Sequence, residues 1–136
     1  MIFDAQNTFS KDQAVTATAL STNTLDLGRG DHGPSERISL VVCANGYTAG
    51  AGSVELQTAD VAASDGALTS PTVIASFPVT ADVLKAGGRI VAARLPHGLK
   101  RYVRLNYNMS TNGAGGTLTA ALVLDVQQAE TLPQAQ

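Results

Sequence analysis

Apolar side chains recur at every second position in the second half of this chain, and no other feature limits the fold as strongly. In the stretch from Lys100 to Ser110 the apolar set is Val103, Leu105, Tyr107 and Met109. In the stretch from Gly116 to Gln127 it is Leu118, Ala120, Leu122, Leu124 and Val126. A period of two places alternate residues on opposite faces of a β-strand. Both stretches are therefore predicted strands with an apolar inner face, and the Asn- and Gly-rich residues 111–116 between them predict a hairpin.

Shorter alternating stretches predict further strands over 37–45, 53–61, 72–79 and 89–95, with weaker candidates over 14–20 and 24–27. Their expected inward residues are Ile38, Leu40, Val42, Val54, Leu56, Val73, Ala75 and Phe77. Turn residues such as Asn45-Gly46 and Asp65-Gly66 separate the strands. The pattern predicts an all-β fold, an antiparallel β-sandwich or jelly roll of about eight strands.

One short helix interrupts the strands. Thr80 has the side chain of an N-cap for Ala81–Ala86, and Gly87-Gly88 can end such a helix. The chain has no alternation of strands with long helices, which argues against a parallel α/β fold and its nucleotide site.

A length of 136 residues predicts a single domain over 1–136. Residues 128–136 have the composition of a polar C-terminal tail. Residues 1–12 are expected to form an N-terminal arm, and the apolar side chains on this arm are Ile2, Phe3 and Phe9. Because an arm with such residues needs a surface to lie on, the three are candidates for contact with a second copy of the chain.

The residues that usually carry chemistry are scarce. One Cys and two His cannot form a disulfide or a four-ligand zinc site. Pro96 and Gly98 match part of the second motif of the cupin metal enzymes, but Arg101 stands where that motif requires His. Cys43 ends an apolar strand without a basic neighbour in the sequence, and we expect an inert buried thiol. The sequence thus predicts no catalytic residue, metal or cofactor.

Basic residues are concentrated in one interval. Six of the nine Lys and Arg residues lie between positions 83 and 104, where no Asp or Glu occurs. A net charge of −2 and an aromatic content of 4% argue against nucleic acid as the partner. A solvated face and a surface for docking an acidic protein both remain open. The candidate docking residues are Arg89, Arg94, Lys100, Arg101, Tyr102, Arg104 and Asn106.

Targeting segments are not predicted. Met1–Asp4 lacks the basic start of a signal peptide, and apolar runs such as 120–124 are too short to span a bilayer. We expect synthesis in the cytoplasm and no contact with a membrane.

Four segments in order resemble one protein family. They are 1–7 (MIFDAQN), 14–28 (including AVTATA, STNT and DLG), 101–107 (RYVRLNY) and 118–127 (LTAALVLDVQ). Together they resemble the capsid cement, or decoration, proteins of tailed bacteriophages, over nearly the full length of the chain. Loops 28–36 and 44–53 match least well, and we assign them no role.

The resemblance implies a non-enzymatic jelly-roll protein on the outer surface of the virion, made in the host cytoplasm. It implies a small homo-oligomer, a dimer with a trimer left open, that clamps neighbouring subunits of the major capsid protein. A charged fraction of 15% fits a surface that is buried against other proteins. The alternatives are a glycan-binding or adhesion module, for which Arg29-Gly30-Asp31 is a weak signal, and a cupin-like metal enzyme. The absence of Trp argues against the glycan-binding module.

Overall fold

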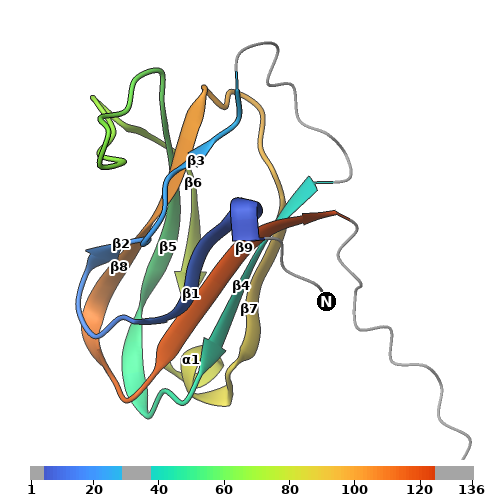
Figure 1. Cartoon of the computed structure of the whole chain (residues 1–136). Helices are drawn as coiled ribbons and strands as arrows, with labels where there is room; N and C mark the ends of the chain where they lie inside the picture. Colours follow the sequence, from blue (N-terminus) through green and yellow to red (C-terminus); the bar gives the residue numbers. More distant parts are fainter. Residues whose placement is uncertain (1–4, 29–37, 125–136) are drawn as a thin grey trace, which may run out of the picture.

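Two antiparallel sheets packed face to face form the molecule (Figure 1). The structure is a computed structural model that describes residues 5–28 and 38–124. Its elements are η1 (Ala5–Asn7), β1 (Thr8–Ala14), β2 (Ala19–Leu20), β3 (Leu25–Asp26), β4 (Ile38–Asn45), β5 (Ala49–Ala59), β6 (Thr72–Val79), α1 (Ala81–Ala86), β7 (Gly88–Arg94), β8 (Tyr102–Ala114) and β9 (Thr117–Leu124). In this part of the chain no helix has the length and apolar character needed to cross a membrane.

The strand order identifies the sandwich as a jelly roll. Sheet A has the order β1-β9-β4-β7, and sheet B has the order β2-β8-β5-β6 with β3 also paired to β8. Within the sheets, β5 pairs with β6, β4 with β7, β2 and β3 with β8, and β1 with β9. The chain is thus one long nested hairpin wrapped into two sheets, as in a jelly roll. The all-β sandwich predicted from the alternating pattern is confirmed.

The predicted hairpin between the last two strands is wrong, because β8 belongs to sheet B and β9 to sheet A. The chain crosses between the sheets at Gly115 and Gly116 instead of turning back. A Cβ atom on Gly116 would lie 2.2 Å from the ring of Tyr47. Glycine is required here because the backbone passes against that ring. The Tyr47 hydroxyl donates a hydrogen bond to the Val15 carbonyl at 2.9 Å, which holds the ring in place.

The core lies between the sheets, and the short helix closes one end of it. The largest fully buried side chains include Phe9, Leu40, Leu56, Leu84, Leu105, Tyr107 and Leu118. The Thr80 hydroxyl accepts a hydrogen bond from the Val83 N–H at 3.3 Å, and the Gly87 N–H donates to the Val83 carbonyl at 3.1 Å. Leu84 of α1 is buried in the core cluster. The predicted helix, with its cap and its stop, is confirmed.

The first strand differs from the sequence prediction. Residues 8–12, which we expected in an N-terminal arm, form the first part of β1 and pair with β9. Phe9 has no exposed surface and lies in the core cluster. Its assignment as an arm residue for a second copy is therefore wrong. Ile2 and Phe3, and the predicted tail over 128–136, lie outside the described residues.

Val73, which the sequence pattern predicts to point into the core, points outward instead. The register of β5 with β6 passes from Leu56–Ala75 to Gln57–Val73, so Ile74 is an extra residue in a β-bulge. Val73 is 47% exposed, while Ile74 packs against the core. The bulge reverses the alternation that a period of two predicts.

Candidate docking surfaces

The sandwich distributes the seven predicted docking residues over its two sheets. Arg89 and Arg94 belong to β7 at the edge of sheet A. Tyr102, Arg104 and Asn106 belong to β8 of sheet B, and Lys100 and Arg101 come directly before it. Because β7 pairs with β4 and not with β8, the structure does not bring the seven residues together on one basic face.

The β8 residues share the outer face of sheet B. Val103 and Leu105 are buried in the core, so Tyr102, Arg104 and Asn106 point to the opposite face. The register places them opposite Ala59, Gln57 and Glu55 of β5. We use the name sheet B polar face for a set of six residues. They are Asp26, Glu55, Gln57, Arg101, Arg104 and Asn106.

Cross-strand hydrogen bonds hold this face in order. The Arg104 Nε donates to the Gln57 Oε1 at 2.9 Å. The Asn106 Nδ2 donates to the Glu55 Oε2, also at 2.9 Å. Each bond joins residues that stand directly opposite in the ladder, where side chains interact most strongly. The two pairs therefore form successive polar rows across β8 and β5.

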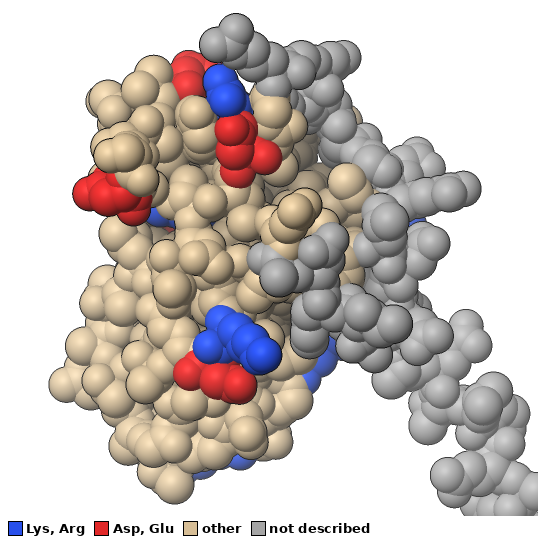
Figure 2. All heavy atoms as spheres, in the orientation of Figure 1, with Lys and Arg blue, Asp and Glu red and all other residues tan. Residues whose placement is uncertain are grey.

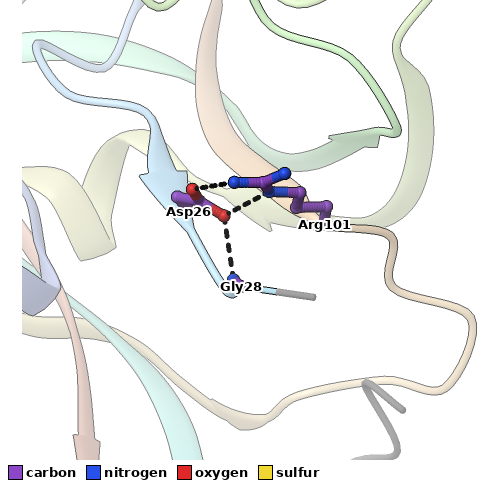
Figure 3. A network of polar contacts seen from close by, with 3 residues as sticks. All are labelled: Asp26, Gly28 and Arg101. Atoms are coloured by element: carbon purple, nitrogen blue, oxygen red, sulfur yellow. Dashed lines mark hydrogen bonds and ion pairs between the residues drawn. The ribbon is translucent and has the colours of Figure 1, made fainter. Parts of the chain in front are cut away.

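Arg101 forms a two-point contact with Asp26 of β3 (Figure 3). Its Nε lies 2.9 Å from Oδ1 and its Nη2 lies 2.8 Å from Oδ2. The Gly28 N–H donates to the same Asp26 Oδ1 at 2.8 Å, and the guanidinium lies 5.0 Å from the centre of the Tyr102 ring. The hydrogen bond to Asp26 raises the pKa of Arg101 above its ordinary value. The planar fork matches the carboxylate and fixes the orientation of the guanidinium.

The neighbouring lysine has a carboxylate partner as well. The Lys100 Nζ lies 3.3 Å from the Asp60 Oδ2, and both side chains are substantially exposed. The carboxylates that pair with Lys100 and Arg101 come from distant parts of the sequence, so these two basic residues do not stand as unpaired charges although their own sequence interval contains no Asp or Glu. Figure 2 shows the same character on one side of the molecule, where blue and red atoms lie together in small groups on a largely uncharged surface.

The outer face of sheet A carries a buried apolar cluster, in contrast to the sheet B polar face. Val41 and Ala121 have no exposed surface and Val123 is 8% exposed; we call these three residues the sheet A outer cluster. Cys43 is partly buried against this cluster, and the register places it opposite Arg89. Burial raises the pKa of the Cys43 thiol, and Arg89 acts in the opposite direction. No residue next to Cys43 in the sequence is basic, but strand pairing brings Arg89 opposite it, and the side chain is partly buried where we expected full burial. The raised pKa disfavours the reactive thiolate, and an inert thiol stays a prediction.

An open, polar hollow lies between β3 and the loop at Asp65-Gly66, with a volume of about 420 Å³. Its described lining residues are Gln6, Thr8, Thr22, Asn23, Thr24, Leu25, Ser64, Asp65 and Gly66. The Thr24 hydroxyl donates to the Gly66 carbonyl at 2.6 Å, which joins the two walls. Hydroxyl and amide groups of this kind can hydrogen-bond a neutral polar ligand.

The described ranges contain no group of three or more His, Cys, Asp or Glu side chains placed to hold a metal ion. His97 is exposed in the loop after β7, and His32 lies outside the described residues.

The sequence matches one protein family along most of its length. The match to the Bbp16 family covers residues 9–126, from the start of β1 to just beyond the end of β9. No curated protein matches the chain. Of the described elements, the matched segment contains α1, β2 to β9 and all of β1 except Thr8, so the similarity concerns the whole jelly roll and not a single motif. The chain belongs to the Bbp16 family.

Proposed function

We propose that this protein is a capsid cement protein of a tailed phage. It binds the outside of the head as a small homo-oligomer, a dimer first and a trimer as the alternative, and clamps adjacent subunits of the major capsid protein. Three findings support the proposal: the sequence resemblance over nearly the full length, the jelly-roll fold, and membership of a family with a phage-related name.

The sheet B polar face is the observation that carries the proposal. Its Arg, Asn, Gln and Glu side chains are already hydrogen-bonded to one another across the strands. Docking therefore buries polar groups that already have hydrogen-bond partners, and Arg101 and Asp26 are buried as an ion pair, which lowers the desolvation cost. Side chains that are ordered before docking also lose less rotamer entropy on binding. Such a face suits a permanent contact with another protein.

The clamp works by adding contacts between coat subunits. An oligomer that binds two subunits must be detached from at least one of them before they separate, so its binding free energy adds to the cost of opening the shell. The second contact forms at a high effective concentration, and modest single contacts become durable. The accessible surface of the chain is 8020 Å². An ordinary interface of roughly 800 Å² per partner would use about a tenth of it.

Cosedimentation with expanded heads that lack this protein tests the proposal. The native protein is expected to bind the heads and to raise their resistance to heat. We expect the double variant Arg101→Glu and Arg104→Glu to lose most binding, because both changes place carboxylates beside Asp26 and Gln57 on the sheet B polar face.

The matched control is Arg89→Glu with Arg94→Glu, which makes the same charge change on sheet A. This variant is expected to bind as the native protein does. Failure of the native protein to bind heads at every salt concentration would overturn the cement proposal. Loss of binding only in the sheet A variant would move the docking surface to the other sheet.

A glycan-binding module is the second candidate, and the polar hollow beside β3 favours it. Thr22, Asn23 and Thr24 line the hollow. Their side chains donate hydrogen bonds within the chain to Gln13, Thr8 and Gly66, so a ligand would meet mainly their oxygen atoms as acceptors. None of its described lining residues is aromatic, whereas sugar rings are usually met by an aromatic face. For this reason we rank the candidate below the cement protein. Binding to a glycan array, and its loss in Asn23→Ala, would support it; an array without binding would remove it.

A further inference from the structure

Two Asn-Gly pairs occur in the chain, at Asn45-Gly46 and at Asn112-Gly113. Asn is a chemically labile residue. It is most labile before Gly, because the backbone nitrogen of the next residue attacks the side-chain carbonyl carbon and Gly has no Cβ to obstruct the approach. From the sequence alone the two pairs are equivalent, but the fold places their backbone nitrogens in different surroundings.

The first pair lies in an exposed turn. Strand β4 ends at Asn45, and Gly46 follows it with a φ of 79°. Both residues are exposed. Within residues 5–28 and 38–124, no hydrogen bond involves the Gly46 N–H or the Asn45 side chain. The nitrogen and the amide that would react are therefore accessible, and no hydrogen-bond partner in this part of the chain holds them apart.

The second pair is held within strand β8. The Gly113 N–H donates a hydrogen bond to the Thr16 carbonyl at 2.8 Å. Gly113 is buried, and a Cβ atom built on it would lie 2.9 Å from the Tyr47 ring and 3.0 Å from the Val15 carbonyl oxygen. Attack by this nitrogen requires loss of the hydrogen bond and movement of a tightly packed backbone. The Asn112 side chain is exposed, but the nitrogen beside it is not available.

We propose that Asn45 is a site of spontaneous deamidation and that the fold protects Asn112 from the same reaction. The Gly46 nitrogen attacks the Asn45 Cγ, and the new C–N bond closes a cyclic imide. The side-chain NH2 leaves as ammonia and takes the proton of the Gly46 N–H. Water then opens the imide at either of its carbonyl carbons, which gives aspartate or isoaspartate. Water is the only co-reactant, and no electrons are transferred.

The modification changes both the charge and the backbone at one end of sheet A. Each event adds one negative charge to a chain whose formal net charge is −2. Isoaspartate also places the side-chain methylene in the main chain, where β4 ends beside Gly87, the residue that follows α1 (Figure 1). The inference goes beyond the cement proposal and does not depend on it, because it concerns the isolated protein and is tested without phage heads.

Peptide mapping of the folded protein, incubated in mildly alkaline buffer at physiological temperature, measures the rates at both sites. The mass gain on exchange of NH2 for OH is followed in the peptides that contain Asn45 and Asn112. Asn45 is expected to convert about tenfold faster or more, because the hydrogen bond and the packing of Gly113 add to the barrier at Asn112. Isoaspartate is expected as the main product, whereas direct hydrolysis of the amide by water yields aspartate alone.

Two controls separate the effect of the fold from that of the sequence. In urea the chain is unfolded and both nitrogens are exposed, so the two rates are expected to become similar. The matched variants are Asn45→Gln and Asn112→Gln, at two exposed positions, because Gln forms the larger cyclic imide much more slowly. Asn45→Gln is expected to remove most of the acidic form that accumulates in the folded protein, as measured by ion-exchange chromatography. Asn112→Gln is expected to leave that form unchanged.

Three outcomes would overturn the proposal. Equal rates at the two sites in the folded protein would show that the fold does not select between them. Faster conversion at Asn112 would show that the hydrogen bond to Thr16 gives no protection. Conversion at both sites in urea, with none at Asn45 in the folded protein, would show that the turn keeps the Gly46 nitrogen away from the Asn45 amide.

Discussion

Buried hydroxyl groups connect strands that lie far apart in the sequence. The Tyr107 hydroxyl donates to the Ser10 Oγ at 2.8 Å, and the Ser10 hydroxyl donates to the Gln13 Oε1 at 2.6 Å. This chain of hydrogen bonds joins β8 of sheet B to β1 of sheet A through the core. Burial, only partly offset by the hydrogen bond to Ser10, raises the pKa of Tyr107 to about 12.

The raised pKa of Tyr107 predicts a loss of stability in alkali. Above pH 10 the unfolded chain releases the phenolic proton while the folded protein keeps it up to about pH 12. The free energy of unfolding should therefore fall between these values, by up to about 1.4 kcal/mol per pH unit from this group. Urea unfolding at several pH values measures the slope. Tyr107→Phe is expected to flatten it, and an unchanged slope in that variant would contradict the assignment.

Thr58 positions the start of the sheet B polar face. Its side chain is fully buried; the hydroxyl donates to the Tyr102 carbonyl at 2.9 Å and accepts from the Lys100 N–H at 2.8 Å. These bonds hold the backbone on both sides of Arg101. Thr58→Val keeps the shape of the side chain but removes the hydroxyl that bonds the Tyr102 carbonyl and the Lys100 N–H. We expect the free energy of unfolding to fall by about 1–3 kcal/mol.

Chemical denaturation of Thr58→Val measures this cost. The matched control is Thr72→Val, which makes the same change at an exposed position in β6 of the same sheet and is expected to be near neutral. Equal stability of the two variants would show that the Thr58 hydroxyl does not hold the segment.

At the level of elements, the sequence pattern was sufficient to predict a strand and its inner face where that strand has one apolar and one polar face. The alternation of Val103, Leu105 and Tyr107 predicts the inner face of β8 correctly, and Thr80 with Gly87 predicts the bounds of α1. Strand β1 was not predicted, because Phe9 is its only large apolar residue. Its register with β9 is also irregular around Asp12, which has a φ of 47°. Local periodicity gives no signal for such a strand; the pairing with β9 forms it.

Pairing between distant elements could not be predicted from local pattern either. Residues 111–116 have the composition of a hairpin loop, yet the crossing to sheet A depends on how the backbone passes the ring of Tyr47. For the docking residues, the neutralising partners Asp26 and Asp60 are distant in sequence, so charge spacing alone predicted too basic a surface.

Gly116 is predicted to be the critical residue of that crossing. In Gly116→Ala the new Cβ would lie 2.2 Å from the Tyr47 ring, so the ring or the backbone must move. We expect a loss of about 3 kcal/mol or more, as for an overpacked core site. Thermal unfolding measures it.

Gly98→Ala is the matched control for Gly116→Ala. Gly98 has a φ of 89°, and no atom lies within 4 Å of a Cβ built on it. It is expected to lose only about 1 kcal/mol from backbone strain. A smaller loss in Gly116→Ala than in Gly98→Ala would contradict the close passage.

At the level of the whole molecule, the two outer faces differ in chemistry. Sheet A presents a buried apolar cluster, and sheet B presents hydrogen-bonded polar rows with compensated charges. If the sheet B polar face docks on the coat protein, little net charge is neutralised in the interface. The proposed docking is then governed by shape and hydrogen bonds more than by long-range attraction.

This charge balance predicts a weak dependence of head binding on salt. Raising NaCl from roughly 50 mM to roughly 300 mM should lower the affinity less than about threefold, because Lys100 and Arg101 already carry carboxylate partners. Cosedimentation at both concentrations measures the change. A loss of affinity of a hundredfold would instead show that free basic groups dominate the contact.

The nested strand order has a consequence for how the protein is made. In sheet A, β9 lies between β1 and β4. Strands β1 and β4 are synthesised early, but they cannot complete their pairing until β9 has been synthesised. The pairs β1–β9 and β4–β9 cannot form before β9 is synthesised, whereas the pairs of sheet B need only β8. Folding is expected to be slow for a domain of this size, because most contacts close long loops. Until β9 is available, β1 and β4 present unpaired edges, and the nascent chain is most prone to aggregation during that interval.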